Sequence, residues 1–121
     1  MITLFRSALV FAPQAEGKKD VLVAGKTIIA VKDVIPVPEG LQVEVVDCEG
    51  MKLVPGLVDA HVHITGGGGE GGPGTRMPEL EIPMMIAGGV TTVVGCLGTD
   101  GITRNVDSVL MKVKSLRANG M

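Results

Sequence analysis

The sequence of 121 residues contains almost no aromatic side chains, with two Phe and neither Trp nor Tyr. Proteins that bind single-stranded nucleic acid stack bases on aromatic rings, so this scarcity argues against such a function. An excess of basic residues is missing as well, because 11 Lys and Arg stand against 13 Asp and Glu, for a net charge of −2. Nucleic-acid backbones select basic surfaces. We therefore expect no nucleic-acid partner.

Long apolar runs and a cysteine framework are also lacking. Residues 8–12 form a short apolar run that Pro13 ends, below the roughly 7–15 residues of a secretory signal. Residues 82–99 carry no charge, but Pro83 and four glycines favour a helix end, a turn and a buried strand over a membrane helix. The two cysteines, Cys48 and Cys96, show no disulfide spacing. We expect a cytoplasmic protein with reduced thiols and no membrane partner.

The chain changes character near residue 54. Five short runs rich in Val, Ile and Leu, separated by turn residues, predict strands at residues 1–5, 20–24, 26–32, 42–46 and 51–54. They are too few and too short for a self-sufficient barrel, and favour a small sheet or half of a sandwich. We therefore assign residues 1–54 to a β-rich accessory segment.

Residues 55–121 alternate between strand and helix. The patterns predict strands at 57–64 and 90–97, the second buried on both faces, and helices at 78–87 and after Asn105. Pro83 should delay or kink the first helix, and Gly88 and Gly89 should end it. Asn105 is the expected N-cap of the second helix, and Gly120 its stop. Two consecutive strand–helix units indicate an α/β fold with a parallel sheet or barrel.

The only two histidines, His61 and His63, lie two residues apart near the end of the first of these strands. Side chains at i and i+2 in a strand share a face, so the imidazoles and Asp59 should project together. Two imidazoles on one strand suit a zinc half-site, although incidental strand histidines are the alternative. Asp59 could orient a ligating imidazole through a hydrogen bond or bond to nearby backbone instead, and the sequence leaves both roles open.

A glycine-rich segment follows directly, and residues 66–74 hold seven of the 18 glycines. A flexible linker is one interpretation, whereas a phosphate cradle lacks its Gly-Lys-Ser/Thr ending. The third is close approach of bare backbone to a ligand, which glycine permits. Glu70 is the single charge in this run, and could bind a substrate ammonium or be an ordinary solvated carboxylate.

The second strand ends in Gly98-Thr99-Asp100, which should lie beside the histidines because consecutive parallel strands are usually neighbours. Thr99 could hydrogen-bond a substrate. Turn formation is the alternative, because Asp100-Gly101 is a strong turn pair.

Four stretches together resemble a known family: VPGLVDAHVH (54–63), HVHITGGGGEGGP (61–73), GVTTVVGCLGTD (89–100) and GITR (101–104). The first is similar to the Asp-x-His-x-His signature of the amidohydrolase superfamily. The glycine-rich stretch with its glutamate and the Leu-Gly-Thr-Asp stretch narrow the resemblance to the isoaspartyl (β-aspartyl) dipeptidases.

The resemblance implies a TIM-like (β/α)8 barrel with a small β-sandwich accessory domain, of which residues 55–121 would form the first two β/α units. It also implies a homo-oligomeric enzyme that uses two zinc ions to hydrolyse isoaspartyl dipeptides. By matching motif, His61 and His63 would ligate zinc, Glu70 would receive the substrate's α-amino group, and Gly68 and Thr99 would lie beside the aspartyl portion.

The same resemblance places the remaining metal ligands, the catalytic aspartate and the carboxylate-binding arginines on later strands, which this sequence does not contain. A (β/α)8 barrel takes roughly 200–400 residues, so we expect the 121-residue chain alone to be inactive. Two alternatives remain open. One is an amidohydrolase of cyclic amides, similar to dihydroorotase or hydantoinase. The other is a non-catalytic fragment that only packs against other chains.

Overall fold

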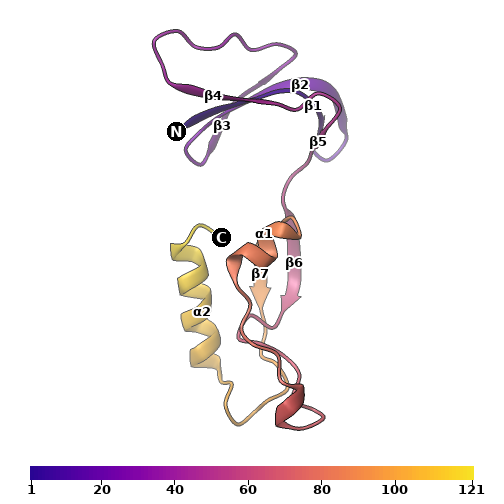
Figure 1. The fold of residues 1–121 in the computed structure, drawn as a ribbon, viewed down its shortest axis with the longest axis vertical. Helices are drawn as coiled ribbons and strands as arrows, with labels where there is room; N and C mark the ends of the chain where they lie inside the picture. The colour runs from indigo at the N-terminus through magenta and orange to yellow at the C-terminus, as the bar shows by residue number, and fades with distance from the viewer. The chain divides into compact units, whose positions relative to one another are not determined.

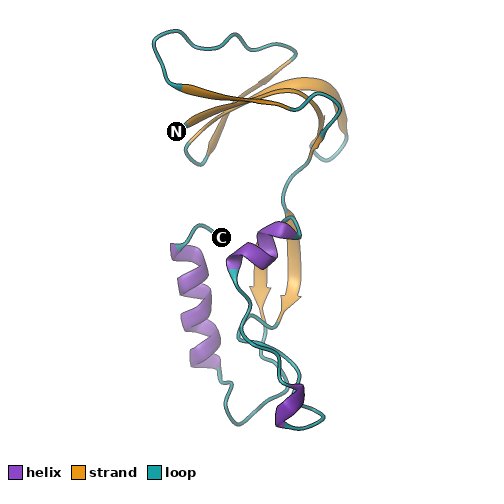
Figure 2. Cartoon of the chain, in the orientation of Figure 1, coloured by secondary structure: helices purple, strands orange, loops and turns teal.

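The computed structural model describes residues 1–121, which form two compact units, Met1–Pro55 and Gly56–Met121 (Figure 1). This division lies one residue from the predicted change of character near residue 54. The first unit is built from strands and the second mixes strands with helices (Figure 2).

The first unit is one mixed sheet in the order β3-β2-β1-β4, with the short β5 also paired to β1. β1 pairs antiparallel with β2 and parallel with β4 and β5. The strands are β1 (Ile2–Phe11), β2 (Ala15–Ala24), β3 (Thr27–Lys32), β4 (Val43–Asp47) and β5 (Lys52–Leu53). These residues form a single sheet, so the second layer of the expected sandwich is not among them.

The two ten-residue strands correct the prediction, which ended the first strand at residue 5 and began the second at residue 20. A register shift between Phe5 and Ala8, with Ser7 at φ 60°, interrupts the alternation of side chains in β1. After this bulge Ala8 joins the same apolar cluster as Val21. Because a bulge inserts residues into one strand, the simple period of two is lost at the sequence level.

Asp20 fixes this bulge from the inside of the first unit. Its buried carboxylate accepts the backbone N–H of Ser7 at 2.8 Å and that of Ile35 at 2.9 Å. The bond from Ile35, followed by the bond from Ser7, holds the pKa of Asp20 below its ordinary value. The ionised carboxylate thus ties the loop after β3 to the irregular part of β1.

The second unit contains β6 (Leu57–Val62), the 3-10 turn η1 (Pro73–Thr75), α1 (Ile82–Ala87), β7 (Val90–Gly95) and α2 (Val106–Ala118). β6 and β7 pair in parallel from Leu57 opposite Val90 to Val62 opposite Gly95. The two strands and both helices share one core, made by Val62, Ile64, Met85 and Leu116.

The predicted helices are present with adjusted ends. α1 begins only at Ile82, with Pro83 in its first turn, and Gly88 caps its end. Asn105 caps α2, because its side chain accepts the N–H of Ser108 while the Ser108 hydroxyl oxygen accepts the N–H of Asn105. Neither α1 nor α2 has the length and the apolar composition of a membrane-spanning helix.

The expectation that the second strand is buried on both faces is wrong. Thr91, Thr92 and Val94 of β7 are exposed, while Val90 and Val93 pack against the core. Two strands and two helices offer too few neighbours to cover both faces of the pair, although the apolar run suits a fully buried strand.

We predict that Asp20→Asn lowers the free energy of unfolding of the first unit by about 2 kcal/mol at pH 7, because buried N–H groups lose a charged acceptor. The pKa of Asp20 is lowered in the folded state, so its stabilisation is present above the ordinary value of 3.8 and is lost as pH falls through the lowered pKa. Urea titrations at pH 7 and at pH 2 to 4, followed by amide signals of β1, measure both effects.

Asp33→Asn is the matched control, because the Asp33 carboxylate is exposed and pairs only with Lys19 at the surface. Surface ion pairs contribute little, so this variant should change stability by under about 1 kcal/mol. Equal losses in the two variants would contradict the role given to Asp20.

Candidate metal and substrate site

His61 and His63 converge at the carboxyl end of β6. Their Nε2 atoms lie 3.1 Å apart, and the two ring centroids lie 5.2 Å apart. Two imidazole nitrogens bound to one tetrahedral zinc ion at 2.0–2.1 Å would be separated by about 3.3 Å. The observed spacing therefore fits a shared metal ion, and it also fits one N–H···N hydrogen bond between the rings.

The pair is a partial donor set. The 121 residues contain no group of three or more His, Cys, Asp or Glu side chains placed to hold a metal ion. Zinc sites in proteins use three or four protein ligands, so the two imidazoles are fewer donors than a complete zinc site has. The residues present thus fit a metal as two of its ligands.

Asp59 lies two residues before His61 on the same strand. Its carboxylate accepts the backbone N–H of His61 at 3.1 Å. This contact corresponds to the backbone-bonding role that the sequence left open, and it places the carboxylate beside the chain segment that carries the histidines.

The three candidate substrate residues meet at one hydroxyl. The Thr99 Oγ1 atom lies 2.9 Å from Oε1 of Glu70 and 3.1 Å from the carbonyl oxygen of Gly68. A hydroxyl has one proton, so it donates to one of these acceptors at a time. The loop after β6 and the segment after β7 are therefore joined at the residues that the sequence singled out.

Glu70 is poised as an anion. Its own backbone N–H, followed by the hydroxyl of Thr99, holds the pKa of the carboxyl below its ordinary value. His63 and Arg104 add smaller electrostatic contributions in the same direction. An ionised carboxylate within electrostatic range of His63 can bind a cationic group of a ligand.

Arg76 is a site residue that the sequence analysis did not single out. Its Nη2 donates to the Thr103 hydroxyl at 2.8 Å and lies 3.1 Å from the Asp100 carboxylate. The hydroxyl and backbone N–H of Thr103 lower the pKa of Asp100 to about 2, to which Arg76 contributes less. An arginine at the end of a glycine-rich run gave no periodic or motif signal, so only the fold reveals this contact.

Two solved structures of one enzyme are similar to this chain over its whole length. The crystal structure of beta-aspartyl dipeptidase from Fervidobacterium islandicum AW-1 is 50% identical, with a TM-score of 0.88, and covers 100% of this chain and 33% of its own. A second structure of that enzyme, in complex with the beta-Asp-Leu dipeptide, gives a TM-score of 0.87 at the same identity, over 100% of this chain and 32% of its own. This chain resembles the N-terminal part of a β-aspartyl dipeptidase.

Other similar proteins carry different enzyme names. Dihydroorotase from Streptococcus pyogenes serotype M3 (strain ATCC BAA-595 / MGAS315) is 31% identical over 110 residues, which are 88% of this chain and 24% of that protein. Dihydropyrimidinase from Brevibacillus agri NCHU1002 is 25% identical with a TM-score of 0.64, over 96% of this chain and 24% of its own. No family model matches the sequence.

The relatives are enzymes of the amidohydrolase superfamily, so the resemblance stated from the motifs is confirmed. The chain spans about a third of the length of the solved β-aspartyl dipeptidase and about a quarter of the curated dihydroorotase. The roles of the individual site residues stay predictions, because identity over an aligned length does not assign a role to any single residue.

Gly98 provides a test of how closely the loop after β6 and the segment after β7 meet. A Cβ at this position would lie 2.8 Å from the Gly66 carbonyl oxygen and 3.1 Å from Nδ1 of His63. We predict that Gly98→Ala displaces the His63 ring and weakens binding of Zn²⁺ or Co²⁺ at least tenfold, measured by calorimetry or by Co²⁺ absorption. Ring-carbon NMR shifts of His63 should move with it.

Gly101→Ala is the matched control, because a Cβ at Gly101 meets no atom within 4 Å. It should leave metal affinity and the His63 signals unchanged. Equal metal affinity in both variants would show that the approach at Gly98 does not position His63.

Proposed function

We propose that this chain forms the N-terminal part of a zinc-dependent β-aspartyl (isoaspartyl) dipeptidase. The observation that carries the proposal is the 50% identity to beta-aspartyl dipeptidase over the entire chain, with the candidate residues inside the matched length. The remaining β/α units of a (β/α)8 barrel would come from outside these 121 residues. The chain by itself is then incomplete and inactive.

In this proposal His61 and His63 supply two zinc ligands at the end of β6. When bound, zinc lowers the pKa of a coordinated water to about 7 and polarises a carbonyl group. The chain's own contribution is to hold the two imidazoles together and to bring the glycine-rich loop beside them.

Glu70 would bind the α-ammonium of the dipeptide. An α-amino group has a pKa near 7.7–8.0, so it is mainly protonated at neutral pH. The lowered pKa of Glu70 keeps the carboxyl ionised at the same pH. Thr99 holds one carboxylate oxygen, and Gly68, whose carbonyl oxygen also lies within hydrogen-bond distance of the Thr99 hydroxyl, would lie beside the aspartyl portion.

A hydrolase of cyclic amides is the second candidate, because the curated relatives are dihydroorotases. Glu70 weighs against it, since a ring substrate offers no free α-amine to a carboxylate at this place. The two candidates therefore differ in the role of one side chain, and that role can be measured.

We predict that joining this chain to the C-terminal two thirds of the Fervidobacterium islandicum enzyme gives a zinc-containing protein that hydrolyses β-Asp-Leu and not dihydroorotate. Glu70→Gln should lower kcat/KM for β-Asp-Leu by about 10- to 100-fold, because an ion pair with the ammonium is lost. Steady-state kinetics and metal analysis measure both results. The 121-residue chain alone should show no hydrolysis.

Glu39→Gln serves as the control, because Glu39 is an exposed carboxylate in the other compact unit. Cleavage of dihydroorotate in preference to β-Asp-Leu would favour the second candidate. Activity of the isolated chain, or no activity with a loaded metal site, would contradict the proposal.

A further inference from the structure

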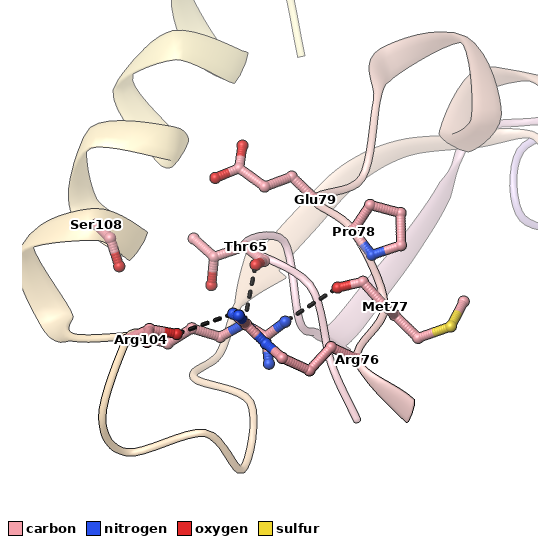
Figure 3. A pocket seen from close by; sticks show the side chains of 8 residues that line it. Thr65, Arg76, Met77, Pro78, Glu79, Arg104 and Ser108 are labelled. Atoms are coloured by element: carbon pink, nitrogen blue, oxygen red, sulfur yellow. Dashed lines mark hydrogen bonds between the residues drawn. The ribbon is translucent and has the colours of Figure 1, made fainter. Parts of the chain in front are cut away.

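Arg104 is a buried cation that binds backbone only. The residue is 6% exposed, and its guanidinium donates from Nε to the Thr65 carbonyl oxygen at 3.1 Å and from Nη2 to that of Met77 at 3.0 Å. A longer contact of 3.4 Å joins Nη1 to the Gly68 carbonyl. Thr65, Met77 and Arg104 help to line a cavity of about 460 Å³. Figure 3 shows the Arg104 side chain among these residues.

With the glycine-rich loop taken as residues 65–77, these three acceptors lie at its start, in its interior and at its end. The N–H of Met77 also donates to the Gly67 carbonyl at 2.8 Å, which closes the loop on itself. A guanidinium offers five N–H donors in a rigid plane, so one side chain can serve all three carbonyls at once. A lysine ammonium is a compact point charge and lacks this fork.

The loop backbone is shaped to accept the guanidinium at Gly66. This residue has φ +89°, and a Cβ here would lie 2.8 Å from Nη2 of Arg104 and 2.3 Å from the Met77 carbonyl oxygen. Glycine is required at such a position both for its backbone conformation and for the space. The glycine at position 66 therefore leaves the space that the Arg104 guanidinium occupies.

Close polar contacts connect Arg104 with Glu70. The Gly68 carbonyl oxygen accepts from Nη1 of Arg104, and the Thr99 hydroxyl lies within reach of both this carbonyl and the Glu70 carboxylate, donating its one proton to either of them. No carboxylate forms a salt bridge with Arg104. Its guanidinium is hydrogen-bonded to backbone carbonyl oxygens of the loop instead. A buried guanidinium that lost these carbonyls would leave polar groups unpaired, which is costly.

We propose that Arg104 is a positioning residue, which holds the glycine-rich loop by three of its carbonyls so that Glu70 stays fixed beside the histidine pair for an ammonium ligand. The role of Glu70 in this statement rests on the proposed dipeptidase function. Arg104 itself is buried, and its guanidinium hydrogen-bonds to backbone carbonyls, so the proposed role acts through the loop.

The test is NMR of the 121-residue chain with Arg104→Met, Arg104→Lys and the control Arg117→Met, whose arginine is exposed on α2. We expect Arg104→Met to shift the amides of residues 65–77 and to raise the pKa of Glu70 toward its ordinary value, read from its carboxyl carbon shift. Arg104→Lys should shift the loop amides and raise the Glu70 pKa less. Arg117→Met should change neither.

Signals of β6 and α2 report whether the unit remains folded. If Arg104→Met unfolds it, Arg104→Lys decides, because it keeps the charge and loses the planar fork. Loop amides and a Glu70 titration identical to the wild type in the folded variants would overturn the proposal. Loss of the whole unit in both variants would also overturn it, since Arg104 would then serve the fold and not the loop.

This experiment measures the conformation of the loop and the titration of Glu70, and it does not measure hydrolysis. A joined enzyme that fails to cleave β-Asp-Leu would contradict the proposed function and leave the Arg104 result intact. Conversely, cleavage of β-Asp-Leu with an unmoved loop in the Arg104 variants would contradict only the positioning role.

Discussion

The parallel pairing of β6 with β7 is the constraint on which the candidate site depends. Parallel strands end at the same edge of a sheet, so the segments that follow them leave side by side. The histidines end β6, and Thr99 follows β7, so the pairing brings residues more than thirty positions apart to one place. Without that register, the Thr99 hydroxyl could not reach Gly68 and Glu70.

Each of the two loops stabilises the other through polar contacts with backbone. The segment after β7 contributes Thr99 and the buried Arg104, and the glycine-rich loop contributes carbonyl oxygens as acceptors. Buried polar groups are costly unless they are paired, so the loop is held in one shape by the groups it satisfies. A run that reads as a flexible linker in isolation is therefore an ordered loop in this structure.

Much of the local structure could be predicted from the sequence, because its signals are local. Asn105 and Gly88 mark helix ends through backbone chemistry that acts over a few residues. The bulge at Ser7 could not be predicted in this way, since the residue that bonds its backbone N–H is Asp20, thirteen positions away, which the N–H of Ile35 also bonds. The exposure of Thr92 and Val94 could not be predicted for a related reason. An apolar run in the sequence does not reveal how many other strands and helices pack against it.

The sequence by itself determined the two histidines on one strand face, the glycine-rich loop with its single glutamate, and the resemblance to β-aspartyl dipeptidases, because these depend on residue type and short spacing. Only the tertiary structure decided that Glu70 bonds to Thr99, that Asp59 bonds to the backbone of His61, and that Arg104 lies beneath the loop. Hydrogen bonds need distances of about 3 Å, and which distant groups come that close is set by strand pairing and packing.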